Sequence, residues 1–224
     1  MTRQFDLDEK IYGRCARLFD HAQRLLKVRI RMHQADRQLH DGDIFLFNHF
    51  ARAETFVPQY CIYQETGAYC RSIASDEFFK GNDRFTQLLQ NVGAVPNDDP
   101  QLLPLLAADI LKGRKVIIFP EGGMVKDRQV LDDEGHFSVY SRSSGTRRKH
   151  HTGAARLTIG LQLFKLAVLH KFKNARHRDL ETWAQQLGLP SVEILLERAR
   201  KPVTVIPANI TFYPLRAQDN FLRR

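Results

Sequence analysis

The sequence has few cysteines and no long apolar run, and both shortages restrict what the chain can be. Its 224 residues include three cysteines, Cys15, Cys61 and Cys70. Their number is odd and their spacing fits neither a zinc site nor a redox motif, so we expect buried thiols of a cytosolic protein.

No segment reaches the roughly 18 to 20 uninterrupted apolar residues that a helix needs to cross a bilayer. The nearest stretch, Leu157 to His170, contains Lys165. The first ten residues hold no apolar signal core, so we expect no secretory leader.

Acidic residues are absent from one long stretch of the chain. Lysine and arginine total 34 and aspartate and glutamate 25, which gives a net charge of +9. No acidic residue lies between His136 and Arg178, where ten residues are basic: Arg142, Arg147, Arg148, Lys149, Arg156, Lys165, Lys171, Lys173, Arg176 and Arg178. Ordinary surfaces intersperse both signs. The excess therefore favours an acidic partner, such as nucleic acid, an anionic membrane or a phosphate-bearing small molecule. Because no helix-turn-helix, zinc or RNA-binding signature is present, we expect no nucleic-acid partner.

Strand-like and helix-like segments alternate along the chain. Short apolar runs predict strands, and amphipathic or apolar stretches of about 10 to 15 residues between them predict helices. The expected strands are 28–32, 44–47, 69–74, 93–95, 116–119 and 203–212, and the expected helices after the first are 54–65, 76–90 and 100–111. This pattern predicts an α/β fold with a mostly parallel central sheet flanked by helices, formed by residues 1–224 as one domain.

Residues 1–27 are expected to form an amphipathic helix with Asp8 as its N-cap. Its apolar face would consist of Ile11, Cys15, Leu18, Phe19, Ala22, Leu25 and Leu26. A basic stripe follows the edge of that face. The helix either packs its apolar face on the domain, as surface helices do, or lies at a membrane interface with its basic residues at lipid head groups.

A histidine ends the expected strand 44–47, and an acidic residue follows it closely. In the segment Asn48-His49-Phe50-Ala51-Arg52-Ala53-Glu54, the histidine precedes a helix start near Glu54. The ring of His49 can fold back over the first turn, where the Glu54 carboxylate would accept a hydrogen bond from Nδ1–H and leave Nε2 free as a base. Such a pair suits general-base catalysis on a hydroxyl or amine, although a structural pair is the simpler interpretation of these two residues alone.

A second motif follows the expected strand 116–119. There the chain continues as Pro120-Glu121-Gly122-Gly123, in which the glycines allow a ligand or another backbone to come close. In parallel sheets ligands bind beyond the carboxyl ends of the strands. Both motifs are therefore expected at that edge, although an ordinary strand-to-loop turn also explains the glycines.

The ordered set of motifs resembles the phospholipid/glycerol acyltransferase family, of which 1-acylglycerol-3-phosphate acyltransferase is the best-known member. The set consists of Asn48-His49 with an acid five residues later, Phe119-Pro120-Glu121-Gly122, Gly153-Ala154-Ala155-Arg156, and the late strand Val205-Ile206-Pro207-Ala208. The resemblance covers roughly residues 25–215. It implies a glycerolipid acyltransferase-like fold.

The resemblance also implies a mechanism. His49, oriented by Glu54, would deprotonate an acceptor hydroxyl, and the oxygen would attack the thioester of acyl-CoA or acyl-carrier protein. These thioesters are co-substrates, and neither a metal nor another cofactor is expected. The expected substrate-binding residues are Asn48, Arg52, Pro120, Glu121, Gly122, Gly123, Lys126 and Arg128. Backbone N–H groups near the Pro-Glu-Gly-Gly turn are candidates for stabilising the oxyanion.

The sequence departs from the family at three places. The first block carries Glu54 where aspartate is usual, the stretch 93–98 lacks the usual phosphate-binding arginine, and Gly123-Met124 replaces threonine and arginine. Substitutes for the missing arginines could come from Arg52, Lys80, Arg84, Lys126 or Arg128. Residues 124–152 are expected to be an inserted loop, either a substrate lid or a surface loop.

The resemblance and the charge together predict an O-acyltransferase that acylates a lysophospholipid such as 1-acylglycerol 3-phosphate. It would be a peripheral protein on the cytoplasmic face of a membrane, held there by basic residues. Two alternatives stay open. One is acylation of glycerol 3-phosphate or of a phosphate-free lysolipid, and the other is a non-catalytic basic module that binds membranes or nucleic acid.

Overall fold

A five-stranded parallel sheet forms the centre of the protein. The computed structural model describes residues 5–33, 36–49, 56–81, 83–122, 134–136, 138–141, 146–149 and 151–211. The strands of the sheet are β1 (Ile44–Phe47), β2 (Cys70–Ala74), β3 (Ala94–Pro96), β4 (Lys115–Ile118) and β7 (Val205–Ala208). Their order is β3-β2-β4-β1-β7, and every neighbouring pair is parallel. The predicted α/β class with a parallel sheet is confirmed.

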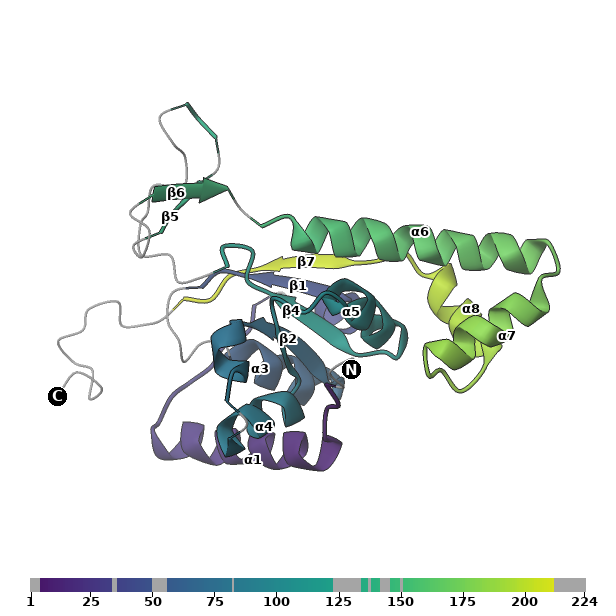
Figure 1. Ribbon diagram of the computed structural model, residues 1–224. Helices are drawn as coiled ribbons and strands as arrows, with labels where there is room; N and C mark the ends of the chain where they lie inside the picture. The colour runs from purple at the N-terminus through teal and green to yellow at the C-terminus, as the bar shows by residue number, and fades with distance from the viewer. Residues whose placement is uncertain are drawn as a thin grey trace.

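Helices cover both faces of this sheet (Figure 1). One face carries α5 (Leu102–Leu111) and α6 (Gly153–Lys173), and the other carries α1 (Glu9–Leu25), α3 (Phe56–Thr66) and α4 (Arg84–Asn91). The remaining helices are α2 (Asp36–Asp41), the 3₁₀ helix η2 (Asp76–Phe79), α7 (His177–Gln186) and α8 (Val192–Arg200). Helix α6 runs past the end of the sheet, where α7 and α8 pack against it. Among the described residues, no helix is both long and apolar enough to cross a bilayer.

Alternate residues of the central strands fill two separate cores. Ile44, Val116 and Ile118 belong to the cluster that includes the buried leucines of α5 and α6. Phe45 and Ile117 belong to a second cluster with Ile62 of α3. Because successive side chains of a strand point to opposite faces, an apolar run such as 44–47 can serve both cores at once.

A buried ion pair links the sheet to α5. Arg71 of β2 donates from Nε to Asp109 of α5, and both side chains are almost fully buried. Asp109 also accepts from Arg114, and Arg71 donates a second hydrogen bond, from Nη2, to the backbone oxygen of Phe5. Removing one partner of such a buried pair would leave a buried charge without its counter-ion.

Lys165 lies inside the protein although it sits on the apolar helix α6. Its side chain is 4% exposed, and Nζ donates to the Lys201 oxygen at 3.1 Å and lies 3.9 Å from Oδ2 of Asp43. Burial lowers the pKa of Lys165, and the Asp43 carboxylate opposes that shift. This lysine therefore ties α6 to the segments before β1 and after α8 and adds no charge to the outer surface.

Helix α1 begins as predicted and packs differently from the prediction. Asp8 is the N-cap and accepts a hydrogen bond from the Ile11 N–H at 2.9 Å. The buried residues of α1 are Tyr12 and Ala16, whereas Leu18, expected on the inner face, is 69% exposed. The helix therefore packs on the domain through a face rotated from the predicted one.

Two other predictions about secondary structure are wrong. Residues 28–32 are not in a strand. The expected helix 76–90 is divided into η2 and α4, because Asp83 caps a new helix by accepting the Thr86 N–H at 2.7 Å. The five residues expected inward on that helix separate accordingly. Phe79 and Leu89 are buried, whereas Phe78, Phe85 and Leu88 are exposed.

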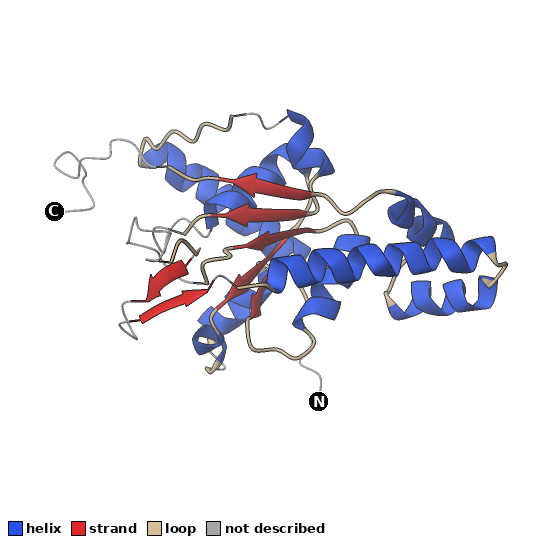
Figure 2. Cartoon of the chain, turned by 90° about the horizontal axis from the view of Figure 1, so that it is seen from above, coloured by secondary structure: helices blue, strands red, loops and turns tan. Residues whose placement is uncertain are grey.

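The expected inserted loop 124–152 contains a β-hairpin. Strand β5 (Ser138–Ser141) pairs antiparallel with β6 (Thr146–Lys149). Most of the remaining residues of the loop lie outside the described part of the chain. Figure 2 shows the hairpin on the side toward which the five parallel strands point. The hairpin thus lies near the carboxyl edge of the sheet.

Candidate functional site

The register between β1 and β4 brings the two sequence motifs to the same level of the sheet. Ile44 pairs with Val116, Phe45 with Ile117 and Leu46 with Ile118. Each pair is separated by the same number of residues, 72, as His49 and Glu121. A parallel register that continues past the strand ends therefore predicts that these two residues lie side by side at the carboxyl edge.

His49 and Glu121 are in direct contact. The backbone N–H of His49 donates to Oε2 of Glu121 at 2.7 Å, and the contact is partly buried. A hydrogen bond to a carboxylate is shorter and stronger than one to a neutral acceptor. The glutamate of the second motif thereby fixes the backbone at the histidine of the first, a role that the sequence did not predict.

The ring of His49 packs against Phe119, the residue that follows β4. The two ring centroids are 4.9 Å apart and the planes are inclined by 43°. Phe119 also approaches Phe47, with ring centroids 6.4 Å apart. His49 is half-buried. One side of the imidazole therefore rests on an aromatic surface, which limits the directions in which the ring can turn. Phe119 was expected as the end of a strand and as part of a motif of the resemblance, and its contact with the His49 ring was not predicted.

Asn48 connects the ends of β1 and β7. Its amide group donates to the Ile210 oxygen at 3.1 Å and accepts from the Ile210 N–H at 2.6 Å. These two bonds extend the β1–β7 pairing beyond the last strand residues. The structure thus gives Asn48 a definite structural contact, while its expected role in binding substrate stays a prediction.

The turn after β4 is held by backbone hydrogen bonds. Gly122 has a positive φ of 61°, which glycine adopts without steric cost. Its N–H donates to the Phe119 oxygen at 2.9 Å, and the His151 N–H donates to the Pro120 oxygen at 3.2 Å. The N–H of Gly122 is therefore engaged within the turn. The second contact joins the start of α6 to the same edge of the sheet.

Several expected site residues lie outside the described part of the chain. These are the expected orienting acid Glu54 and the substrate-binding candidates Arg52, Gly123, Lys126 and Arg128. Their roles stay predictions. Of the other possible phosphate ligands, Lys80 follows η2 at the carboxyl edge, and its Nζ pairs with Asp76 at 2.9 Å.

The stretch 93–98, compared above with the family's arginine-bearing block, contains a residue that makes structural contacts. Asn97 follows β3, and its Oδ1 accepts the Asp76 N–H at 3.0 Å. The backbone N–H of Asn97 donates to the Ala74 oxygen, also at 3.0 Å. Asn97 therefore joins the ends of β2 and β3 and contributes no positive charge to the site.

Among the residues that the structure describes, no metal-binding cluster is found at this edge, and an open groove lies away from it. Within the described ranges, no group of three or more His, Cys, Asp or Glu residues could hold a metal ion. An open groove of about 400 Å³ lies between α1 and α3, and its lining includes Lys10, Arg14, Arg17 and Tyr63. It involves the first half of α1 and the last half of α3. Since α3 starts just after the carboxyl edge, the groove lies toward the opposite edge.

The carboxyl edge thus combines a half-buried histidine, a carboxylate on its backbone and an aromatic ring beneath it. This set can hold an imidazole in a fixed place, and an imidazole can accept a proton from a nearby hydroxyl. Comparison with known proteins adds no independent assignment: no protein-family model, no curated protein and no solved structure matches this chain.

Proposed function

We propose that this protein is an acyltransferase that moves a fatty acyl group from a thioester to the hydroxyl of a lysophospholipid, with His49 as the general base. The single arrangement that supports the proposal is the contact between His49 and Glu121 at the carboxyl edge. These residues belong to Asn48-His49 and Phe119-Pro120-Glu121-Gly122, two of the four motifs on which the resemblance to the phospholipid/glycerol acyltransferases depends. A glycerolipid acyltransferase-like fold is part of the same proposal.

In the proposed reaction, an imidazole nitrogen of His49 accepts the proton of the acceptor hydroxyl. The oxygen attacks the thioester carbonyl, a carbon–oxygen bond forms, and the carbon–sulfur bond breaks as the thiolate leaves. The imidazolium then returns the proton to the leaving thiolate. The donor is acyl-CoA or acyl-carrier protein, and no covalent acyl-enzyme is required. Glu54 is the proposed orienting acid.

The acceptor is proposed to be a lysolipid at the surface of a membrane. Apart from the buried Lys165, the stretch from His136 to Arg178 carries nine basic residues and no acidic residue, and basic residues are attracted to anionic lipid. We propose a peripheral protein on the cytoplasmic face. The stretch 93–98 contains no arginine, and its Asn97 contacts Asp76, which favours one alternative, a lysolipid without a phosphate at the acceptor end.

The test is to incubate the protein with acyl-CoA and a panel of acceptors, and to detect both released thiol and acylated lipid. The panel contains 1-acylglycerol 3-phosphate, glycerol 3-phosphate and phosphate-free lysolipids. We expect His49→Ala to lower acyl transfer by about 10²- to 10⁴-fold, the usual contribution of a general base. The control is His170→Ala, since His170 is exposed on α6, away from the carboxyl edge.

Circular dichroism and thermal unfolding should show that His49→Ala remains folded. Full transfer activity in folded His49→Ala would refute the role of the histidine. Absence of acylated product with every acceptor and donor, together with intact vesicle binding, would favour a non-catalytic module. Loss of activity in both histidine variants would show that the assay reports something other than the proposed base.

A further inference from the structure

Helix α1 ends in an apolar segment that the domain leaves exposed. We call residues 25–33 the α1 tip. Its exposed apolar side chains are Leu25 (83% exposed), Leu26 (58%), Val28 (52%) and Met32 (43%). Soluble domains rarely expose several large apolar side chains next to one another without a binding role. The first part of α1 differs, since Tyr12 and Ala16 are buried there.

The chain has a defined conformation where the helix ends. The Lys27 N–H donates to the Arg24 oxygen at 3.2 Å, and the Val28 N–H donates to the Gln23 oxygen at 3.0 Å. This pair of bonds is a Schellman motif, which usually places glycine where Lys27 stands. Lys27 has a φ of 54°, a left-handed conformation that is unfavourable for a residue with a side chain.

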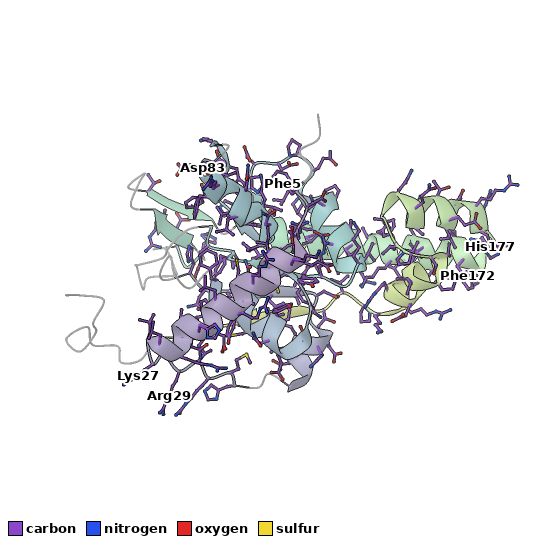
Figure 3. The ribbon with its side chains drawn as sticks, turned by 90° about the horizontal axis from the view of Figure 1, so that it is seen from below. Phe5, Lys27, Arg29, Asp83, Phe172 and His177 are labelled. Atoms are coloured by element: carbon purple, nitrogen blue, oxygen red, sulfur yellow. The ribbon has the colours of Figure 1, made fainter. Side chains whose placement is uncertain are left out.

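Positive charges alternate with the apolar residues of the tip. From Leu26 to Met32 every second residue is apolar, and the residues between them are Lys27, Arg29 and Arg31. No acidic residue occurs from His21 to Ala35. Figure 3 shows Lys27 and Arg29 projecting from the end of α1. Apolar side chains interleaved with lysine and arginine are typical of segments that lie in the interface of an anionic bilayer.

The tip lies at the same edge of the sheet as His49. Tyr12, early in α1, packs against Tyr63, late in α3, whereas Phe19 packs against Tyr60. Helix α1 therefore runs antiparallel to α3, which starts just after the carboxyl end of β1. From Phe19 to Leu25 the helix rises about 9 Å. This rise carries the tip to the start of α3 or beyond, and Figure 1 shows that end of α1 on the side of the strands' carboxyl ends.

We propose that the α1 tip docks the protein on an anionic lipid surface with the carboxyl edge facing the lipid. The positive charge disfavours a second copy of the chain, because two tips would repel each other. It also disfavours nucleic acid as the main partner, because phosphate contacts need no exposed leucines. That this orientation presents lysolipid to His49 rests on the proposed function, whereas the docking itself does not.

The apolar contribution is tested by cosedimentation with vesicles of phosphatidylcholine and phosphatidylglycerol. The variant Leu25→Glu/Leu26→Glu should bind at least about tenfold more weakly than the wild type, because two apolar contacts are replaced by anions. The matched control is Leu163→Glu/Leu166→Glu on α6. These leucines are also exposed, at 60% and 52%, and lie on the opposite face of the sheet. The control should bind within about twofold of the wild type.

The charge contribution is tested with Lys27→Gly. This variant should unfold at a slightly higher temperature, because glycine accepts the left-handed conformation. It should nevertheless bind anionic vesicles about fivefold more weakly, which is the effect of one basic residue near an anionic surface. A gain in stability with a loss of binding separates docking from folding.

Three results would overturn the proposal: no binding of the wild type to anionic vesicles, unchanged binding of folded Leu25→Glu/Leu26→Glu, or an equal loss in the α6 control. An equal loss would place the docking face elsewhere. Equal binding to neutral and anionic vesicles would also contradict the role given to Lys27, Arg29 and Arg31. Because binding is measured without substrate, a failure of the proposed acyl transfer would leave this result unaffected.

Discussion

Replacing Glu121 tests whether its carboxylate holds the candidate catalytic histidine or binds substrate. The carboxylate accepts the backbone N–H of His49 at 2.7 Å in a partly buried position. Hydrogen bonds to charged groups contribute about 1.5 to 3 kcal/mol. For Glu121→Ala we therefore expect a loss of about 2 kcal/mol in the free energy of unfolding. For a chain of this size that loss lowers the melting temperature by about 4 to 8 °C.

The kinetic effect distinguishes the two roles. A displacement of His49 of about 1 Å lowers turnover by about 10²-fold. As a positioning residue, Glu121 should therefore affect kcat in Glu121→Ala and leave KM nearly unchanged. Glu121→Gln retains an acceptor oxygen, so it should recover most of both stability and kcat. Glu197→Ala, an exposed position on α8, is the control for loss of a carboxylate.

Two results would refute the positioning role. One is a rise in KM with normal kcat and normal stability, which would assign Glu121 to substrate binding. The other is a Glu121→Gln variant as impaired as Glu121→Ala, which would show that the negative charge itself is required. Urea unfolding and steady-state kinetics with varied acceptor measure all these quantities.

Two further predictions concern the sheet. Gly93 has a φ of 91°, and a Cβ atom there would lie 2.2 Å from the Cys70 oxygen, so Gly93→Ala should cost about 3 kcal/mol in urea unfolding. Gly67→Ala, with a φ of 69° and nothing within 4 Å, should cost only about 1 kcal/mol, and equal costs would contradict the clash. Burial raises the pKa of the Cys70 thiol from 9.0 to about 12. The thiol therefore loses its proton at a lower pH in the unfolded chain than in the folded protein. Its contribution to stability is complete below about pH 9 and falls as the pH rises toward 12. The difference in unfolding free energy between wild type and Cys70→Ala should narrow from about pH 8 to pH 10.5, and a constant difference would contradict the shift.

The parts of the fold that the sequence predicts well are those with a local signal. Strand β1 begins and ends as expected, because an Asp-Gly-Asp turn precedes four apolar residues. The break between η2 and α4 was missed because an apolar helical spacing continues across it. Only the competing cap at Asp83, which accepts the Thr86 N–H, ends one helix and starts another. The face that α1 buries depends on tertiary partners such as Tyr60, which helical periodicity does not reveal.

The site was predictable to the level of the sheet edge. The rule that ligands bind beyond the carboxyl ends of parallel strands brought both motifs to one edge. The contact between Glu121 and the His49 N–H depends on the register of β1 with β4, which apolar runs alone do not specify. Asn48 likewise needed the position of β7, a strand about 160 residues later, before its bonds to Ile210 could be known.

The place of β1 in the sheet has a consequence for how the chain acquires its site. The neighbours of this strand, β4 and β7, are 72 and 161 residues farther along the chain. During synthesis, the strand before His49 must therefore wait until β7 has been made before both its edges are paired. Until Val205–Ala208 leave the ribosome, one edge of β1 has unpaired N–H and C=O groups that can pair with a strand of another chain. The edge of the sheet that carries His49 is thus completed only once β7 has been made, and a chain stopped before Val205 would leave β1 open to aggregation.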